Sequence, residues 1–263
     1  MTDDTIETSP RLKARIAGAL YLISGTLFVR GMPVLTGDAA ATAHNILAHK
    51  TLFRLGFVAE LISAPSYIAV TLLLYDLLRP VNRSLALLAT VFSLVGSTIG
   101  AVDCLFHLAP LIVLGGSHYL SVFSMEQLQA LALLSLNFHA QGLNICMVFF
   151  GFFCLLLGYL IFRSIFLPRI IGVLLAIAGL CYLTNYLATF LAPEFAAHLF
   201  PYILIPGLAE IVLALWLLVA GVNVQRWKEQ AGHRSSDPEA IRYLKEKDAR
   251  GNFVITLESN NKA

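Results

Sequence analysis

Long apolar stretches alternate with short polar segments along most of the chain. Six of these stretches contain about 20 or more predominantly apolar residues, the length at which an α-helix crosses the hydrocarbon core of a bilayer. They run approximately over residues 14–33, 55–78, 84–114, 128–162, 167–191 and 202–224. The pattern predicts an all-α fold, a polytopic membrane bundle of about six transmembrane helices.

The third and fourth stretches are too long for one perpendicular crossing. At 1.5 Å per residue, 35 residues reach about 52 Å, whereas the hydrocarbon core is about 30 Å thick. These two helices are therefore expected to tilt, kink or protrude. Ser124 followed by Gln127 is a capping-box pattern, and it predicts that the fourth helix begins outside the bilayer.

The composition agrees with residence in a membrane. Hydrophobic residues make up 58% of the chain and charged residues 13%, so the apolar surface exceeds what one soluble core could hide. The net charge of +2 is scattered over segment ends, and no nucleic acid partner is expected. The four cysteines lie inside apolar stretches without metal-ligand spacing and are interpreted as small core residues: Cys104, Cys146, Cys154 and Cys181.

Lysine and arginine gather in the segments at one side of the predicted bundle. Cytoplasmic loops of membrane proteins are enriched in these residues. The connections on the other side carry Lys50 and Arg54 in the first and no lysine or arginine over residues 115–127 and 192–201. We expect a multi-pass protein of the cell membrane with both ends in the cytoplasm. The basic residues of the inner segments are Arg11, Lys13, Arg15, Arg79, Arg83, Arg163, Arg169, Arg226 and Lys228.

Two polar segments flank the predicted membrane domain. Residues 1–13 are expected to form a cytoplasmic leader, residues 14–224 the six-helix domain, and residues 225–263 a polar cytoplasmic tail. The tail has a helix-start pattern at Asp237 and Pro238, but its charge and lack of a core predict that it is largely disordered. A docking peptide for a partner is the alternative.

Several short motifs, most of them around the inner loops, recur in a fixed order. They are Leu52-Phe53-Arg54-Leu55-Gly56, Leu74-Tyr75, Arg79-Pro80-Val81-Asn82, Leu157-Gly158-Tyr159-Leu160, Arg163-Ser164, and Leu167-Pro168-Arg169-Ile170 with Gly172. In this combination the chain resembles the integral membrane family catalogued as domain of unknown function 4386, over about residues 11–224. The resemblance implies a multi-helix membrane protein and supplies no catalytic residues.

Polar side chains inside the predicted spans are the candidate functional residues. A charge at mid-membrane costs about 2.5–3.5 kcal/mol on insertion scales, so such groups usually face the bundle interior or a water-filled cavity. Counting from the predicted outer ends places them at a common depth in the outer half. The candidate ligand-binding residues are Arg30, Glu60, Asp103, His107, His139, Asn144, Asn185 and Glu210.

The third span carries its polar residues as a stripe at three- and four-residue steps, which keeps them on one helical face. Close helix packing through small residues explains such a stripe equally well. For Glu60 and Glu210, the alternative to a functional role is a carboxylic acid held neutral by burial or paired with Arg30. The stripe consists of Ser93, Gly96, Ser97, Gly100, Asp103, Cys104 and His107.

A possible internal repeat relates the two glutamates. Residues 15–20 match residues 169–174 at a constant offset. Glu60 follows Arg15, and Glu210 follows Arg169, at nearly the same distance along the chain. Spans one and two are then a parallel repeat of spans five and six, and the two glutamates are expected to face one central space near Asp103. Chance similarity between sequences rich in leucine, isoleucine and glycine is the alternative.

Three classes of function stay open at this point, and the cofactor, if there is one, is unknown. The preferred class is binding or transport of a small molecule or cation through an outward-facing polar cavity. The second is an intramembrane hydrolase in which Asp103, His107 and His139 hold a metal and a glutamate acts as the base. The third is an accessory or assembly protein. The lipid bilayer is the expected partner, and a homo-oligomer is compatible with the sequence.

Overall fold

Helices make up most of the chain that the structure describes. The structure is a computed structural model, and it describes residues 9–31, 37–199 and 204–235, among which no strand occurs. The helices are α1 (Pro10–Gly31), α2 (Ala39–Ala48), α3 (Lys50–Leu78), α4 (Arg83–Val113), the 3₁₀ helix η1 (His118–Leu120), α5 (Met125–Arg163), α6 (Arg169–Leu191), α7 (Pro193–Leu199), α8 (Leu204–Val219) and α9 (Val224–Ser235). The predicted all-α class is confirmed.

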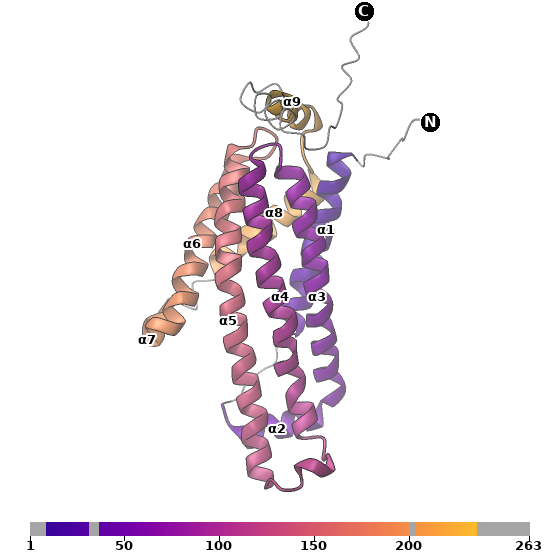
Figure 1. Cartoon of the computed structure of the whole chain (residues 1–263), viewed down its shortest axis with the longest axis vertical. Helices are drawn as coiled ribbons and strands as arrows, with labels where there is room; N and C mark the ends of the chain where they lie inside the picture. Colours follow the sequence, from indigo (N-terminus) through magenta and orange to yellow (C-terminus); the bar gives the residue numbers. More distant parts are fainter. Residues whose placement is uncertain (1–8, 32–36, 200–203, 236–263) are drawn as a thin grey trace, which may run out of the picture.

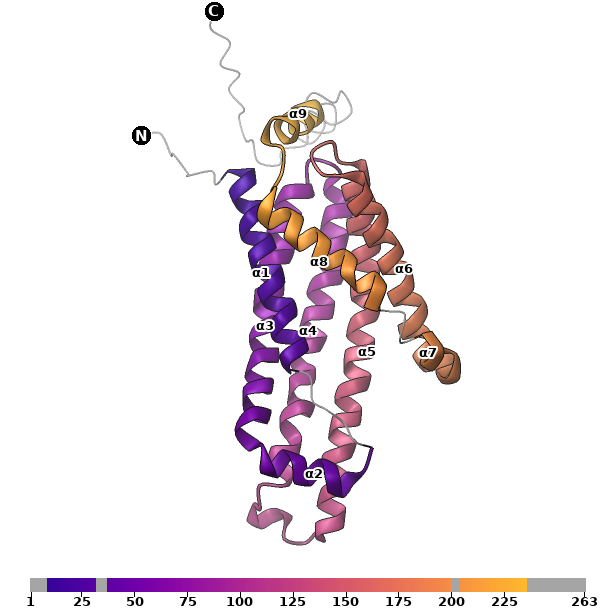
Figure 2. The same cartoon turned by 180° about the vertical axis from the view of Figure 1, so that it is seen from behind.

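The long helices stand side by side in an elongated bundle (Figure 1). α3, α4 and α5 pack in sequence order, α1 packs along α3, and α6 packs along α5. α8 crosses the back of the bundle obliquely between α6 and α1 (Figure 2). α2 lies across one end, and α9 lies across the other at an angle of 101° to α8.

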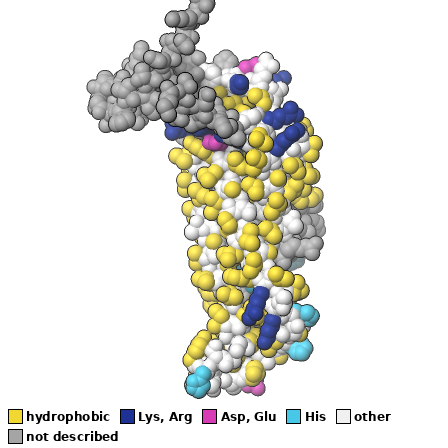
Figure 3. All heavy atoms as spheres, turned by 90° about the vertical axis from the view of Figure 1, so that its right-hand side faces the viewer, with side chains coloured by type: hydrophobic (Ala, Val, Ile, Leu, Met, Phe, Trp, Pro, Cys, Tyr) yellow, Lys and Arg dark blue, Asp and Glu magenta, His cyan; other side chains and the backbone are white. Residues whose placement is uncertain are grey.

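The apolar residues of the long helices face outward as well as inward. Four helices, α3 to α6, are long and apolar enough to cross a membrane, and the most apolar part of each is only 28–44% buried inside the protein. Figure 3 shows the resulting hydrophobic surface over most of the height of the bundle. A surface of this kind requires lipid rather than water around it.

The predicted number of six spans is not confirmed. Within the described ranges, four helices qualify as spans, or five if the bent pair of α8 and α9 counts as one. α8 is a 16-residue helix, which is shorter than the roughly 20 residues of a complete perpendicular crossing. The sequence supplied enough apolar residues near α8, but their pattern does not reveal where the helix bends.

The ends of the two longest helices lie within a few residues of the prediction. α4 covers 31 residues and α5 covers 39. The predicted capping box is present, because the backbone N–H of Gln127 donates to Ser124 Oγ and the backbone N–H of Ser124 donates to Gln127 Oε1. The long apolar run of α5 is therefore one continuous helix, which at about 58 Å exceeds the thickness of a bilayer core.

The basic segments meet at one end of the bundle. Lys13 Nζ lies 2.8 Å from Asp76 Oδ2, which joins the start of α1 to the end of α3. Trp227 of α9 donates through Nε1 to the carbonyl of Leu77 at 2.9 Å, and Arg226 contacts the carbonyl of Ile165 in the α5–α6 loop. We refer to this end as the basic end. That it faces the cytoplasm stays a prediction.

Close backbone contact between α5 and α6 requires glycine. A Cβ atom added to Gly172 would lie 2.6 Å from the carbonyl oxygen of Gly158 and 2.6 Å from the backbone nitrogen of Phe162. Such a distance is far inside van der Waals contact, so neither helix could keep its place. Small residues at a membrane helix interface allow this approach, and dispersion contacts along the two helices then stabilise the pair.

Candidate functional site

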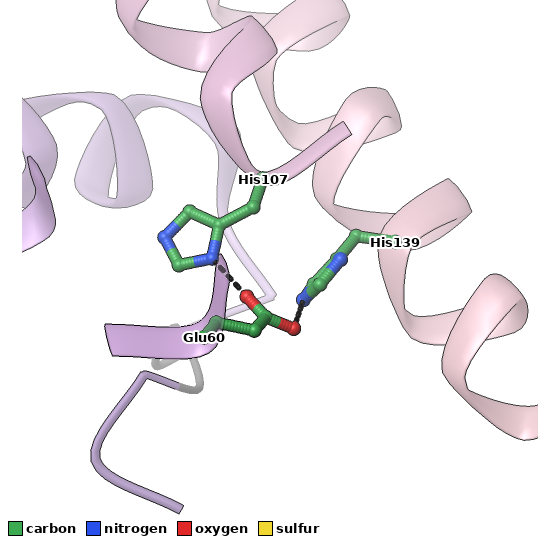
Figure 4. Close-up of side chains that lie close together, drawn as sticks. All are labelled: Glu60, His107 and His139. Carbon is green, nitrogen blue, oxygen red and sulfur yellow. Dashed lines mark hydrogen bonds and ion pairs between the residues drawn. The ribbon is translucent and has the colours of Figure 1, made fainter. Parts of the chain in front are cut away.

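Four polar side chains from three helices meet where α3, α4 and α5 pack together. Glu60 of α3 lies between two histidines (Figure 4): its Oε2 is 2.7 Å from His107 Nδ1, and its Oε1 is 3.4 Å from His139 Nε2. The other ring nitrogen of His139, Nδ1, lies 2.7 Å from Asp103 Oδ2. The order of the chain of contacts is therefore His107, Glu60, His139 and Asp103. We call these four residues the Glu–His cluster.

The Glu–His cluster is almost fully removed from solvent. The exposed fraction of the four residues ranges from 0% for His107 to 4% for Glu60. Buried polar atoms in native proteins almost always have a hydrogen-bond partner. Here His107 Nε2 has none within the described chain, and Glu60 Oε1 and His139 Nε2 have only each other, at 3.4 Å. A proton, a water molecule or an ion can satisfy atoms of this kind.

The contact between His139 and Glu60 depends on where the imidazole proton lies. If Nδ1 of His139 carries its proton toward Asp103, then Nε2 presents a lone pair, and this lone pair faces a carboxylate oxygen. Two electron-rich atoms at 3.4 Å in a low-dielectric interior repel each other. A proton on Nε2 or a metal ion between the two atoms removes that repulsion.

The geometry fits a metal ion. Glu60, His107 and His139 each offer one ligand atom, and these atoms all lie within 4.8 Å of one another. Zinc ligands stand about 2.0–2.2 Å from the ion, so two ligand atoms of one ion are at most about 4.4 Å apart, which is close to the spacing of these three side chains. Imidazole nitrogens and a carboxylate oxygen form a ligand set that zinc accepts.

Asp103 occupies the position of an outer carboxylate. Metal-binding histidines usually donate their second N–H to a carboxylate or a carbonyl, which fixes the ring and its tautomer. His139 has both at hand, because its Nδ1 also lies 3.4 Å from the backbone carbonyl of Asp103. Gly142 of α5 makes room for this carboxylate, since a Cβ there would be 2.0 Å from Asp103 Oδ1.

Aromatic residues close the site on the side of α3. The ring of Phe53 meets the ring of His107 edge to face, with centroids 4.6 Å apart, and Phe57 lies 6.1 Å away in a similar orientation. The rings of His107 and His139 are 5.3 Å apart. An apolar wall of this kind keeps water away and strengthens the electrostatic interactions inside it.

The Glu–His cluster lies far from the basic end. His139 is about 36 Å from Arg163 along α5, and His107 is the same distance from Arg83 along α4. If the basic end marks one face of a hydrocarbon core of about 30 Å, the cluster lies near the opposite face. That this face is the outer one, as expected for Glu60, Asp103, His107 and His139, stays a prediction.

Glu210 belongs to a different network. Tyr182 of α6 donates to Glu210 Oε1 at 2.8 Å, and Tyr21 of α1 donates to Oε2. Tyr21 also lies 3.2 Å from the hydroxyl of Tyr67 on α3. Because Tyr67 is about 10 Å from Glu60 along the same helix, Glu210 and Glu60 lie at different depths. The shared space that the repeat predicted for the two glutamates is not supported by these contacts.

Among the described side chains, the remaining candidates Asn144 and Asn185 take no part in either network. Nδ2 of Asn144 donates to Gln141 Oε1 at 3.3 Å. Asn185 is 3% exposed, and its Oδ1 has no partner in the described residues. Arg30 ends α1, but its side chain lies outside the described residues, so the proposed pairing of Arg30 with a glutamate stays a prediction.

Sequence reasoning missed the residues that support the charged groups. Tyr21, Tyr67 and Tyr182 count as apolar in a hydrophobic run, yet each has a hydroxyl that requires a partner when buried. Gly142 carries no side chain and looked like any other glycine of a membrane helix. A search for tyrosine and glycine within spans that contain carboxylates is the signal that could have found them.

Comparison with known proteins places the chain in a family. Residues 16–221 match the family described as Domain of unknown function (DUF4386), which confirms the resemblance seen in the sequence motifs. An uncharacterized protein of Archaeoglobus fulgidus is 27% identical over 157 residues, a stretch that covers 59% of this chain and 76% of that protein. No solved structure matches the chain.

Proposed function

We propose that this chain, which belongs to the DUF4386 family, is a membrane-embedded metalloprotein that binds one zinc ion through Glu60, His107 and His139. The observation that carries the proposal is the convergence of three ligand atoms, from three different helices, within 4.8 Å of one another in a buried site. Glu60 Oε1 and His139 Nε2 have no other hydrogen-bond partner within the described residues, which also supports it. A buried polar atom without a partner destabilises the fold by about 1–3 kcal/mol, and a bound ion would remove this penalty.

The ligand set decides which ion fits. Magnesium and calcium prefer six or more oxygen ligands, and this site offers two nitrogens and one carboxylate. Copper(I) and iron–sulfur clusters prefer thiolates, and no cysteine belongs to the three ligands. Zinc accepts two histidines and a glutamate in a tetrahedral arrangement.

The ligand count supports hydrolysis as the use of the ion. Structural zinc sites usually have four protein ligands, whereas catalytic sites have three and keep the fourth position for water. Here Asp103 contacts His139 and stands behind the ring rather than beside the other ligand atoms. With zinc present, the fourth position would hold a water of lowered pKa, the nucleophile of a metal-dependent hydrolase.

A cavity for an organic ligand is less well supported than an ion site. Glu60 and the two histidines contact one another directly, so the space between them suits an ion.

The structure also changes the roles of the individual residues within the metal hypothesis. The sequence suggested Asp103, His107 and His139 as ligands with a glutamate as base, whereas the distances favour Glu60 as a ligand and Asp103 as the residue that positions His139.

Metal analysis of the full chain tests the proposal. The protein is expressed with zinc in the medium, purified in detergent, dialysed, and measured by inductively coupled plasma mass spectrometry. We expect about one zinc per chain in the parent and a loss of most of it in Glu60→Gln and His107→Ala. His118→Ala, at an exposed histidine of η1, and Glu210→Gln, at the carboxylate held by Tyr21 and Tyr182, serve as matched controls and should retain zinc.

Two results would count against the proposal. A folded parent protein that binds no zinc, nickel, cobalt or iron would show that protons alone stabilise the Glu–His cluster. Zinc that survives in both Glu60→Gln and His107→Ala would show that the metal binds elsewhere.

A further inference from the structure

A second site of interest lies at the basic end, where α8 stops and α9 begins. A pocket of about 440 Å³ opens there between the start of α1, the α5–α6 loop and the α8–α9 corner. This volume is within the range of about 300–1,000 Å³ that is usual for ligand pockets. The residues that line it are Arg11, Phe166, Trp216, Ala220, Gly221, Val222, Asn223 and Val224.

The corner itself has a defined backbone structure. Gly221 has a φ of 69°, a left-handed conformation that glycine adopts without strain and that commonly ends a helix. The backbone N–H groups of Ala220 and Gly221 both donate to the carbonyl of Trp216. After this turn, Asn223 caps α9, because its Oδ1 accepts from the backbone N–H of Arg226. The pocket is therefore formed by fixed elements.

Charge and aromatic character distinguish the pocket lining. Arg11 is the charged residue of the lining, and its Cγ is 3.1 Å from the position that a Cβ on Gly221 would take. Trp216 is 41% exposed at the end of α8. Arginine binds phosphate groups with several N–H donors, and tryptophan is enriched where a membrane protein meets the headgroup region.

The position relative to the bilayer suggests the occupant. α8 turns by 101° into α9 at this corner, so a helix among lipid-facing elements changes there into a polar helix that lies across the end of the bundle. The corner also lies among the other basic residues of this end. Lys13 pairs with Asp76, and Arg15 donates to the carbonyl of Val219. Pockets with basic residues between membrane helices bind anionic lipid headgroups.

We propose that this pocket binds the phosphate-containing headgroup of an anionic phospholipid, with Arg11 as the charged contact and Trp216 beside the headgroup. The site is separate from the Glu–His cluster and does not depend on it. Lipid bound there would connect α1, the α5–α6 loop and the α8–α9 corner, which are the parts that close the basic end.

Tryptophan fluorescence in bilayers of stated composition tests the lipid site. The chain has two tryptophans, so Trp227→Phe leaves Trp216 as the single reporter. The full-length variant is reconstituted in phosphatidylcholine that contains increasing fractions of brominated phosphatidylglycerol or brominated phosphatidylcholine. We expect the anionic lipid to quench Trp216 at a lower fraction, and Arg11→Gln to reduce this preference about fivefold.

Matched controls separate a pocket from general attraction. Arg54→Gln removes an exposed arginine at the start of α3, away from the basic end, and should leave the preference unchanged. Millimolar inorganic phosphate should not relieve the quenching. If Trp227→Phe fails to fold, native mass spectrometry of the parent and Arg11→Gln proteins counts retained phosphatidylglycerol directly.

Three results would overturn the lipid site. The first is equal quenching by the two lipids. The second is an equal loss of preference in Arg11→Gln and Arg54→Gln, which would mean that net charge alone acts. The third is displacement of the lipid by inorganic phosphate, which would indicate a site for a free anion.

Discussion

At the scale of single residues, His139 connects the two carboxylates of the Glu–His cluster. One ring nitrogen lies 3.4 Å from Glu60 and the other 2.7 Å from Asp103. The contact with Asp103 fixes the orientation of the imidazole ring, so that Nε2 points toward Glu60. If the site binds zinc as proposed, its affinity for zinc depends on Asp103, although Asp103 is not among the three ligands.

Gly142→Ala tests the positioning role of Asp103 without changing any polar group. The new Cβ would lie 2.0 Å from Asp103 Oδ1, so the carboxylate must move away from His139. We expect the zinc dissociation constant, measured by competition with a chromophoric chelator, to rise about 10- to 100-fold. Gly100→Ala on α4 is the control, because its Cβ would meet only Cys146 Sγ at 3.6 Å. Equal affinities in the two variants would contradict the positioning role.

Tyr182→Phe tests whether the Glu210 network is structural. The hydroxyl of Tyr182 donates to Glu210 Oε1 at 2.8 Å, and its removal leaves a carboxylate oxygen without this donor. We expect the free energy of unfolding in detergent to fall by about 1.5–3 kcal/mol, with the zinc content unchanged. Tyr159→Phe, at a tyrosine that is 49% exposed, is the matched control. A loss of zinc in Tyr182→Phe would show that the two networks depend on each other.

The sequence predicted which polar residues lie inside the bundle better than it predicted their partners. Burial of a carboxylate or a histidine in a span follows from hydropathy alone, and Glu60, Asp103, His107 and His139 were all candidates. The pairing of Glu60 with the histidines, rather than with Glu210, depends on how α3, α4 and α5 rotate against one another. No residue spacing within one helix encodes that rotation.

At the scale of the elements, the interface of α5 and α6 depends on small residues. Gly172→Ala would put a Cβ 2.6 Å from backbone atoms of α5, and backbone atoms cannot rotate away as a side chain can. We expect a loss of about 1–3 kcal/mol in the free energy of unfolding, measured by a detergent unfolding titration.

The control for this prediction is Gly25→Ala on α1. A Cβ there meets no atom within 4 Å, and alanine favours a helix over glycine by about 1 kcal/mol. Gly25→Ala should therefore be neutral or stabilising. Equal free energies of unfolding for Gly172→Ala and Gly25→Ala would contradict the close backbone contact between α5 and α6.

Hydropathy predicted the elements well where apolar runs end at polar caps. Asn82 and Ser124 accept hydrogen bonds from the first turns of α4 and α5, and both helices begin where the sequence indicated. α8 differs, because its bend at Gly221 falls inside a region of continuous apolar character. The proposed repeat meets a similar limit: α1 packs along α3, whereas α8 crosses obliquely between α6 and α1.

At the scale of the whole molecule, the two ends of the bundle differ in charge, and we expect them to face opposite sides of the membrane. The α3–α4 connection and α9 share the basic end, and η1 lies at the opposite end of α4. Single cysteines at positions 82 and 235 should react with a membrane-impermeant maleimide only after cells are opened, whereas position 117 should react in intact cells. Labelling of position 82 in intact cells would reverse the orientation and place the Glu–His cluster near the cytoplasmic face.

The most direct test of the metal centre is to locate the ion. Crystals of the zinc-loaded full chain, measured at the zinc absorption edge, give an anomalous difference map. The account predicts one peak between Glu60, His107 and His139, at about 2.0–2.2 Å from the nearest nitrogen and oxygen atoms. A peak at any other group of residues, or no peak in a well-ordered cluster from protein saturated with zinc, would contradict it.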